Sequence, residues 1–147
     1  MTALHTPEAL RERVQASFER QGLMRHLGAQ VHHVAQGECV VLLPYSERVT
    51  QQQGAFHGGA IGALADIAAG YAALTVAPAG AEVVTAEYKI NFLAGCSGGQ
   101  LRASGRVVKG GKRVIVTAAE VLHIADDGQE TLCAVLQQTI VPVPKTY

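Results

Sequence analysis

One stretch of the chain constrains the fold more than any other: between Gly58 and Ala81 the only charged side chain is Asp66. The residues around it are mostly Ala, Gly, Ile and Leu, and apolar positions recur at helical spacing from about Gly59 to Val76. The other faces of this helix are also small and apolar, so we expect it to be buried on every side. That predicts a helix wrapped by a sheet, with a partner molecule covering what remains.

The same run is long enough to raise the question of a membrane span. Its Ala and Gly content, the charge on Asp66 and the proline at position 78 argue against one. The chain has 147 residues, 48% of them hydrophobic, which suits a single domain over residues 1–147. Twelve basic and twelve acidic residues cancel, and this disfavours a nucleic-acid partner.

The cysteines and the N-terminus bear on the cell compartment. Cys39, Cys96 and Cys133 are scattered and form no C-x-x-C pair, which indicates reduced thiols in a cytoplasmic protein. The first residues lack the basic start and apolar core of a signal peptide.

The remaining elements predict an α+β fold. A charged helix is expected over residues 7–20, stopping at Gly22. Alternating or apolar patterns predict strands over 27–35, 38–43, 84–92, 100–108, 114–124 and 130–141. The strand over 84–92 shows a clean period of two, in which Val84 and Tyr88 alternate with Thr85 and Glu87. One helix packed on a curved antiparallel sheet of five or six strands satisfies this order.

The loop over residues 45–57 leads directly into the apolar helix, and long loops in compact domains are often functional. A lone carboxylate in an apolar helix carries a desolvation cost that chemistry can justify. The N–H groups of Gly58 and Gly59 lie at the expected helix start, where an oxyanion could bind. The motif reads Gly54-x-x-His57-Gly58-Gly59-x-x-x-x-Leu64-Ala65-Asp66-x-Ala68.

The motif and the order of elements resemble the hotdog fold and, within it, the PaaI-type (phenylacetyl-CoA thioesterase-like) acyl-CoA thioesterases. The likeness covers roughly residues 25–142. It implies that Asp66 is the nucleophile or general base, and that the Gly58 N–H polarises the thioester carbonyl. It also implies an active site at a dimer interface, in a homodimer or a homotetramer built as a dimer of dimers, with CoA as part of the substrate and no separate cofactor.

The chain departs from that family at two positions. Gln51 stands where many members carry Asn, and in this it resembles 4-hydroxybenzoyl-CoA and enterobactin-type thioesterases, which pair Gln with a helical Glu. Gly70 stands where relatives often have Ser or Thr to hold the attacking water. Thr85 falls where some relatives place a Ser near the same water, and it is the candidate substitute.

Thioester hydrolysis needs oxyanion stabilisation and an activated nucleophile. The Gly58 N–H, with the Gln51 side-chain amide as a second donor, supplies the first, and Asp66 supplies the second. Gly58 and Asp66 are eight residues apart, which is about 12 Å of helix rise. One chain can hardly bring both to one carbonyl, so the spacing predicts that Asp66 of one chain faces Gly58 of another.

Each of these residues also has a purely structural interpretation. Asp66 could be a buried carboxylate satisfied by neighbours, and the two glycines could serve a tight helix entry. His57 could be a catalytic base, or a loop residue whose ring braces the Gln51 loop. Thr85 could be an ordinary strand residue, and Gln51 one of three adjacent glutamines.

Outside the motif, Lys109, Lys112 and Arg113 surround a Gly-Gly turn. They are either solvated hairpin charges or, as the resemblance implies, a site for the CoA phosphates. The histidines show no zinc-ligand spacing with the cysteines, so we expect no metal. The expected activity is hydrolysis of aryl or medium-chain acyl-CoA. The alternatives are a hotdog hydratase or dehydratase, whose His-Phe-Pro type of signature is missing here, and a non-catalytic acyl-CoA binding module.

Overall fold

The computed structural model describes residues 6–147. The expectation that the N-terminus is not a signal peptide concerns, in part, residues 1–5, which lie outside this range. Helices α1, α2 and α3 span Pro7–Phe18, Gly22–Leu27 and Gly58–Leu74, with a 3-10 turn, η2, at Glu47–Val49. The six strands β1 to β6 span, in order, Gln30–Ala35, Glu38–Pro44, Ala81–Phe92, Gln100–Lys109, Ile115–Ile124 and Glu130–Pro144.

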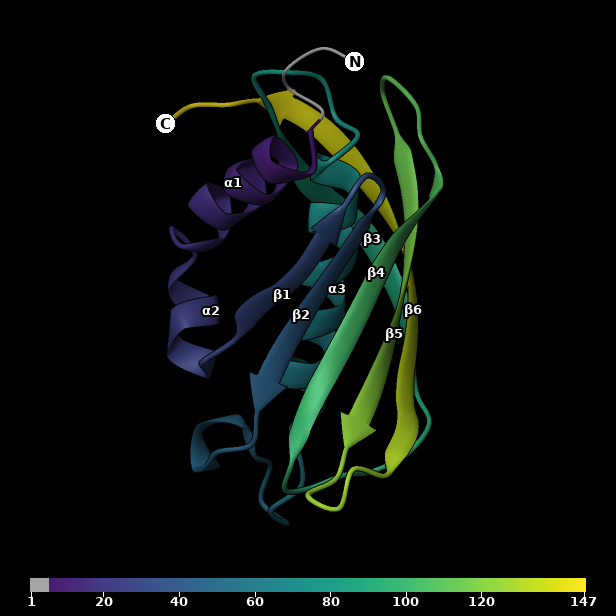
Figure 1. Ribbon diagram of the computed structural model, residues 1–147. Helices are drawn as coiled ribbons and strands as arrows, with labels where there is room; N and C mark the ends of the chain where they lie inside the picture. Colours follow the sequence, from purple (N-terminus) through teal and green to yellow (C-terminus); the bar gives the residue numbers. More distant parts are fainter. Residues whose placement is uncertain (1–5) are drawn as a thin grey trace.

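The sheet is antiparallel throughout and curves around α3, which confirms the predicted hotdog architecture (Figure 1). The strand order is β1-β2-β4-β5-β6-β3. Short reversals join β4 to β5 and β5 to β6, as the Gly-rich turns predict. Strand β3 follows α3 directly, and its only strand partner in the described chain is β6, so it forms an edge of the sheet.

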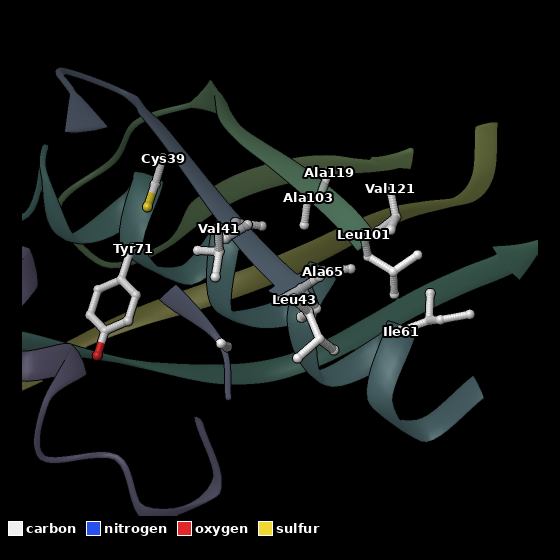
Figure 2. Packing of buried hydrophobic residues seen from close by; sticks show 14 of the residues in the cluster. Cys39, Val41, Leu43, Ile61, Ala65, Tyr71, Leu101, Ala103, Ala119 and Val121 are labelled. Atoms are coloured by element: carbon white, nitrogen blue, oxygen red, sulfur yellow. The ribbon is translucent and has the colours of Figure 1, made fainter. Parts of the chain in front are cut away.

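Helix α3 lies so close to the middle of the sheet that only small residues fit between them. A Cβ built on Gly105 of β4 would lie 2.3 Å from the carbonyl carbon and oxygen of Ala68. Ala65 and Ala68 are fully buried, and larger side chains such as Leu43 and Leu101 fill the space along the helix (Figure 2). The small, apolar composition of the helix therefore follows from backbone-to-backbone packing.

The N-terminal region differs from the sequence-based prediction. Helix α1 ends at Phe18, and Gly22 begins a second helix, α2, instead of ending the first. The strand predicted from Leu27 starts only at Gln30, because Gly28 ends α2 in the left-handed conformation with φ 84°. A glycine at this position terminates a helix without steric cost.

The predicted alternation in β3 is wrong in its first half. The pairing with β6 shifts between Thr85 and Glu87, so Ala86 is an extra residue in a β-bulge. Thr85 is paired with Ile140 and Tyr88 with Gln138, and both partners are buried on the helix side of β6. The bulge therefore turns Thr85 to the same face as Tyr88, whereas a period of two would put them on opposite faces.

Candidate active site

The carboxylate of Asp66 is bound by a residue from β3. Thr85 donates a hydrogen bond from Oγ1 to Asp66 Oδ1 at 2.7 Å. The two residues are 19 positions apart, and the β-bulge at Ala86 is what turns Thr85 toward the helix. Thr85, which the sequence suggests as the residue that positions the attacking water, thus contacts the Asp66 carboxylate directly.

The environment of Asp66 shifts its acidity. Burial raises the pKa of the Asp66 carboxyl, because the charged form loses solvation, and the hydrogen bond from Thr85 partly lowers it again. The same helix turn is also held by Gln138 of the neighbouring strand β6, which is 1% exposed and donates from Nε2 to the Asp66 carbonyl oxygen at 3.2 Å. The carboxylate is therefore fixed in position and half-buried, which suits a base or nucleophile.

The start of α3 leaves one backbone donor open. His57 is the N-cap: its ring Nδ1 accepts from the Gly59 N–H at 2.7 Å, and its carbonyl oxygen accepts from Ala60 and Ile61. The ring thus bonds to the helix, and not to the Gln51 loop as expected. Within residues 6–147 the Gly58 N–H has no acceptor.

Gly59 is needed for this cap. A Cβ at position 59 would lie 2.9 Å from His57 Nδ1, so a side chain there would push the ring away from its hydrogen bond. The backbone of His57 is held in turn, because its N–H donates to Val49 at 2.7 Å. These contacts explain the His-Gly-Gly sequence: His57 and Gly59 fix the helix end, and Gly58 presents a donor.

Gln51 lies beside that donor. Gln51, Gly58 and Phe92 line one surface hollow of about 350 Å³. The side-chain oxygen of Gln51 accepts from the Gln53 N–H, which leaves its NH₂ group as the free end of the amide. The hollow therefore has a side-chain and a backbone donor available together.

Asp66 and Gly58 open onto separate spaces in one chain. Asp66 and Thr85 line a cavity of about 80 Å³ that extends to Tyr71 and to Gln21 beyond α1, and Gly58 is not part of it. Within one chain, the predicted carboxylate and the predicted donors therefore line separate hollows.

A set of polar side chains at the far side of the Asp66 cavity was missed by sequence reasoning. Ser17, Gln21 and Glu82 line it together with Tyr71. Tyr71 Oη lies 2.8 Å from Gln21 Nε2 and 3.1 Å from Ser17 Oγ. The sequence carries no local signal for this set, because Gln21 lies beyond the end of α1 and meets Ser17 and Tyr71 only through tertiary packing.

The basic residues of the β4–β5 hairpin lie elsewhere. Lys109, Lys112 and Arg113 are exposed, and none of them lines the Asp66 cavity or the Gly58 hollow. Lys109 is the last residue of β4, and the strand extends about 30 Å from its first residue, Gln100, to Lys109. Within one chain, the structure does not bring these charges to the site.

Within residues 6–147 no three His, Cys, Asp or Glu side chains are grouped so that they could hold a metal ion. No helix in that part of the chain has both the length and the apolar character needed to cross a bilayer. All three cysteines are free and buried.

Comparison with known proteins agrees with this geometry. The crystal structure of a thioesterase family protein from Silicibacter pomeroyi superposes with a TM-score of 0.89 at 32% identity, covering 92% of this chain and 99% of that one. The E. coli PaaI protein of the phenylacetic acid degradation operon has the same fold, with a TM-score of 0.82 at 22% identity over 95% of this chain and 97% of its own.

Sequence comparison points the same way. A Saccharolobus solfataricus protein named "Putative esterase" is 40% identical over 98 residues, which are 67% of this chain and 69% of that protein. The model of the thioesterase superfamily matches residues 53–129, which include the His-Gly-Gly turn, all of α3 and Thr85. The chain therefore belongs to the thioesterase superfamily.

Proposed function

We propose that this protein hydrolyses acyl-CoA thioesters to a free acid and CoA, with an aryl or medium-chain acyl group. The observation that carries the proposal is the hydrogen bond from Thr85 to Asp66, because it places a hydroxyl and a half-buried carboxylate together at the edge of a cavity. Three buried free thiols suit the reducing cytoplasm as the site of this activity.

In the proposed mechanism the thioester carbonyl accepts a hydrogen bond from the Gly58 N–H, and the Gln51 amide supplies a second one. The helix dipole of α3 favours the negative charge that develops on this oxygen. Asp66, oriented by Thr85, either attacks the carbonyl carbon or removes a proton from an attacking water. If water attacks, the C–S bond breaks as the tetrahedral intermediate collapses, the free acid forms, and the proton held by Asp66 passes to the CoA thiolate. If Asp66 attacks, CoA leaves as the thiolate, and water then hydrolyses the mixed anhydride, which releases the acid and regenerates the Asp66 carboxylate while a proton goes to the thiolate.

The active unit in this proposal is a homodimer with two shared sites. The donors and the carboxylate are about 12 Å apart along α3 and line separate hollows, so each site takes Gly58 from one chain and Asp66 from its partner. Strand β3 offers a surface for this contact: it is an edge strand, and Tyr88 and Phe92, which share one face of it, are 45% and 54% exposed. The partner can also present Lys109, Lys112 and Arg113 to the CoA phosphates.

A matched pair of variants at position 58 tests the donor. Gly58→Pro removes the N–H, whereas Gly58→Ala keeps it, and both add the same Cβ next to the exposed Phe92 ring. Proline suits the first position of a helix, and His57 already has the extended conformation, φ −66° and ψ 135°, that precedes a proline. We expect Gly58→Pro to lower kcat about 100-fold or more and Gly58→Ala to lower it far less.

Mixing two inactive variants tests the shared site. A chain with Gly58→Pro still has Asp66, and a chain with Asp66→Asn still has Gly58, so a mixed dimer contains one intact site. Random exchange of equal amounts should restore about a quarter of the wild-type thiol release. If the mixture stays inactive while gel filtration shows mixed dimers, the shared site is excluded. If Asp66→Asn alone hydrolyses acyl-CoA as fast as the wild type, the proposed chemistry is excluded.

A further inference from the structure

The cavity beside Asp66 runs along α3 toward the N-terminal helix α1. Asp66 and Thr85 line one end of it, and Tyr71, Ser17 and Gln21 line the other. Tyr71 is five residues after Asp66 on α3, which is about 7.5 Å of helix rise. The cavity therefore leads from the carboxylate away from the Gly58 end of the same helix.

The size and lining of this cavity suit water and not an acyl group. Its volume is about 80 Å³, and most of the residues that line it carry a polar side chain. A water molecule occupies about 30 Å³ in the liquid, so about two or three fit, whereas a cavity that binds benzene measures about 150 Å³. Polar cavities of sufficient size hold water, and apolar ones stay dry. The acyl group therefore has to lie elsewhere in the assembled site.

The polar groups at the α1 end of the cavity can both donate and accept hydrogen bonds. Ser17 Oγ and Tyr71 Oη are 3.1 Å apart, and either hydroxyl can be the donor. Burial raises the pKa of Tyr71 to about 12, so its hydroxyl stays protonated near neutral pH. Gln21 donates from Nε2 to Tyr71 Oη at 2.8 Å, and in the part of the chain that the structure describes its second N–H and its Oε1 have no partner. Water suits such a set, because it donates or accepts as each neighbour requires.

The two ends of the cavity differ in their access to solvent once the proposed site is assembled. Asp66 and Thr85 lie beside the edge strand β3, which the partner chain and the substrate cover in the proposed dimer. At the other end Gln21 and Glu82 are half-buried, so this end reaches the molecular surface next to α1. A closed site can therefore still receive water from the α1 side.

We propose that the cavity beside Asp66 is the passage through which the hydrolytic water reaches the carboxylate, and that this water enters next to α1. The inference rests on the proposed thioesterase function and makes it more specific. When water attacks directly, its oxygen bonds to the thioester carbon, its proton passes to Asp66, the C–S bond breaks, and the proton then passes to the CoA thiolate. When Asp66 attacks first, the same passage supplies the water that hydrolyses the mixed anhydride.

Filling the cavity from either end tests the passage. In Gly70→Met the new side chain leans back over the preceding helix turn, toward Asp66, and its Cβ meets Gln138 Nε2 only at 3.9 Å. In Ser17→Met the same side chain fills the α1 end, and Tyr71 keeps its hydrogen bond from Gln21. We expect each variant to lower kcat for hexanoyl-CoA about tenfold or more. The control is Ala16→Met on the exposed side of α1, which should leave kcat unchanged.

Binding of hexyl-CoA, a thioether that cannot be hydrolysed, separates water supply from acyl binding. If the cavity carries water, Gly70→Met and Ser17→Met should bind hexyl-CoA with the wild-type Kd while kcat falls, and urea denaturation should show that both variants are folded. A Kd that rises as much as kcat falls would make the cavity an acyl site and overturn the inference. An unchanged kcat in either folded variant would also overturn it, and the thioesterase function would stand as long as the wild type hydrolyses hexanoyl-CoA in an Asp66-dependent way. If the wild type hydrolyses neither aryl nor medium-chain acyl-CoA, both fail.

Discussion

The two flanks of α3 are built differently. Toward the middle of the sheet, Gly105 and Ala68 bring two backbones into direct contact, and a Cβ at position 105 would lie 2.3 Å from the helix. Toward the edge strand β3, Asp66 is half-buried beside Thr85 and a cavity of about 80 Å³. The first, which we call the tight flank, excludes everything but backbone and methyl groups, and the second, the loose flank, leaves a cavity lined in part by polar side chains.

This difference shows how a small domain separates stability from chemistry. The tight flank fixes the distance of α3 from the sheet and its rotation about its own axis, because even one extra carbon atom cannot be accommodated there. The loose flank can then hold a partly desolvated carboxylate at a defined place without being responsible for holding the helix. We therefore expect substitutions on the two flanks to have effects of different kind and size.

The largest effect should come from adding a methyl group to the tight flank. Gly105→Ala should lower the free energy of unfolding by about 3 kcal/mol or more, because the new Cβ overlaps the Ala68 carbonyl group. The matched control is Gly70→Ala on α3, two residues after Ala68, where a Cβ would lie 3.9 Å from Gln138 Nε2. There the change should be neutral or stabilising by about 0.5–1 kcal/mol. Urea denaturation measures both, and equal losses would remove the distinction between the flanks.

An intermediate effect, on activity, should come from Thr85→Val on the loose flank. The Thr85 hydroxyl favours the charged form of Asp66, so its removal raises the pKa of that carboxyl further. Because the ionised carboxylate is the active form in the proposed mechanism, the acid limb of the kcat/KM profile should move to higher pH, with a loss of about tenfold on its acidic side. Thr85→Ser should restore the wild-type limb. A pH profile unchanged by Thr85→Val would mean that the hydroxyl does not act on Asp66.

The smallest effect concerns the stability cost of the carboxylate itself. Burial raises the pKa of folded Asp66 above its ordinary value of 3.8, so the folded protein binds this proton more tightly than the unfolded chain. Wild-type stability should therefore fall as the pH rises through the interval between these two values. Asp66→Asn should be more stable than the wild type at neutral pH, and the gap should close as the pH falls below 4. A gap independent of pH, measured by urea denaturation, would contradict this.

Much of the tight flank could be predicted from the sequence. An Ala- and Gly-rich helix without charge other than Asp66 requires burial on every side, and a wrapped sheet is the solution that the structure has. The positions of Gly58 and Asp66 on the helix also follow from the sequence, because helical spacing is regular. Their separation gave the expectation of a shared site, which remains a prediction.

The loose flank was harder to predict because it depends on irregular features. A β-bulge has no fixed sequence signature here, so a strand with perfect alternation was expected, although Ala86 interrupts it. The ring of His57 caps the helix, which a His before two glycines only partly indicates. Ser17, Gln21 and Glu82 meet Tyr71 only through tertiary packing of α1 and β3 on α3, which local patterns do not encode.

The His57 cap has a consequence for competition by small anions. Helix ends that bind phosphate or sulfate present several N–H groups to several oxygen atoms. Here the second, third and fourth N–H groups of α3 are already satisfied by His57, and among the contacts of residues 6–147 only the first is open. Such an end recognises a single oxygen atom and gives a tetrahedral anion little to bind. Inorganic phosphate or sulfate in the surrounding solution should therefore compete poorly for this donor.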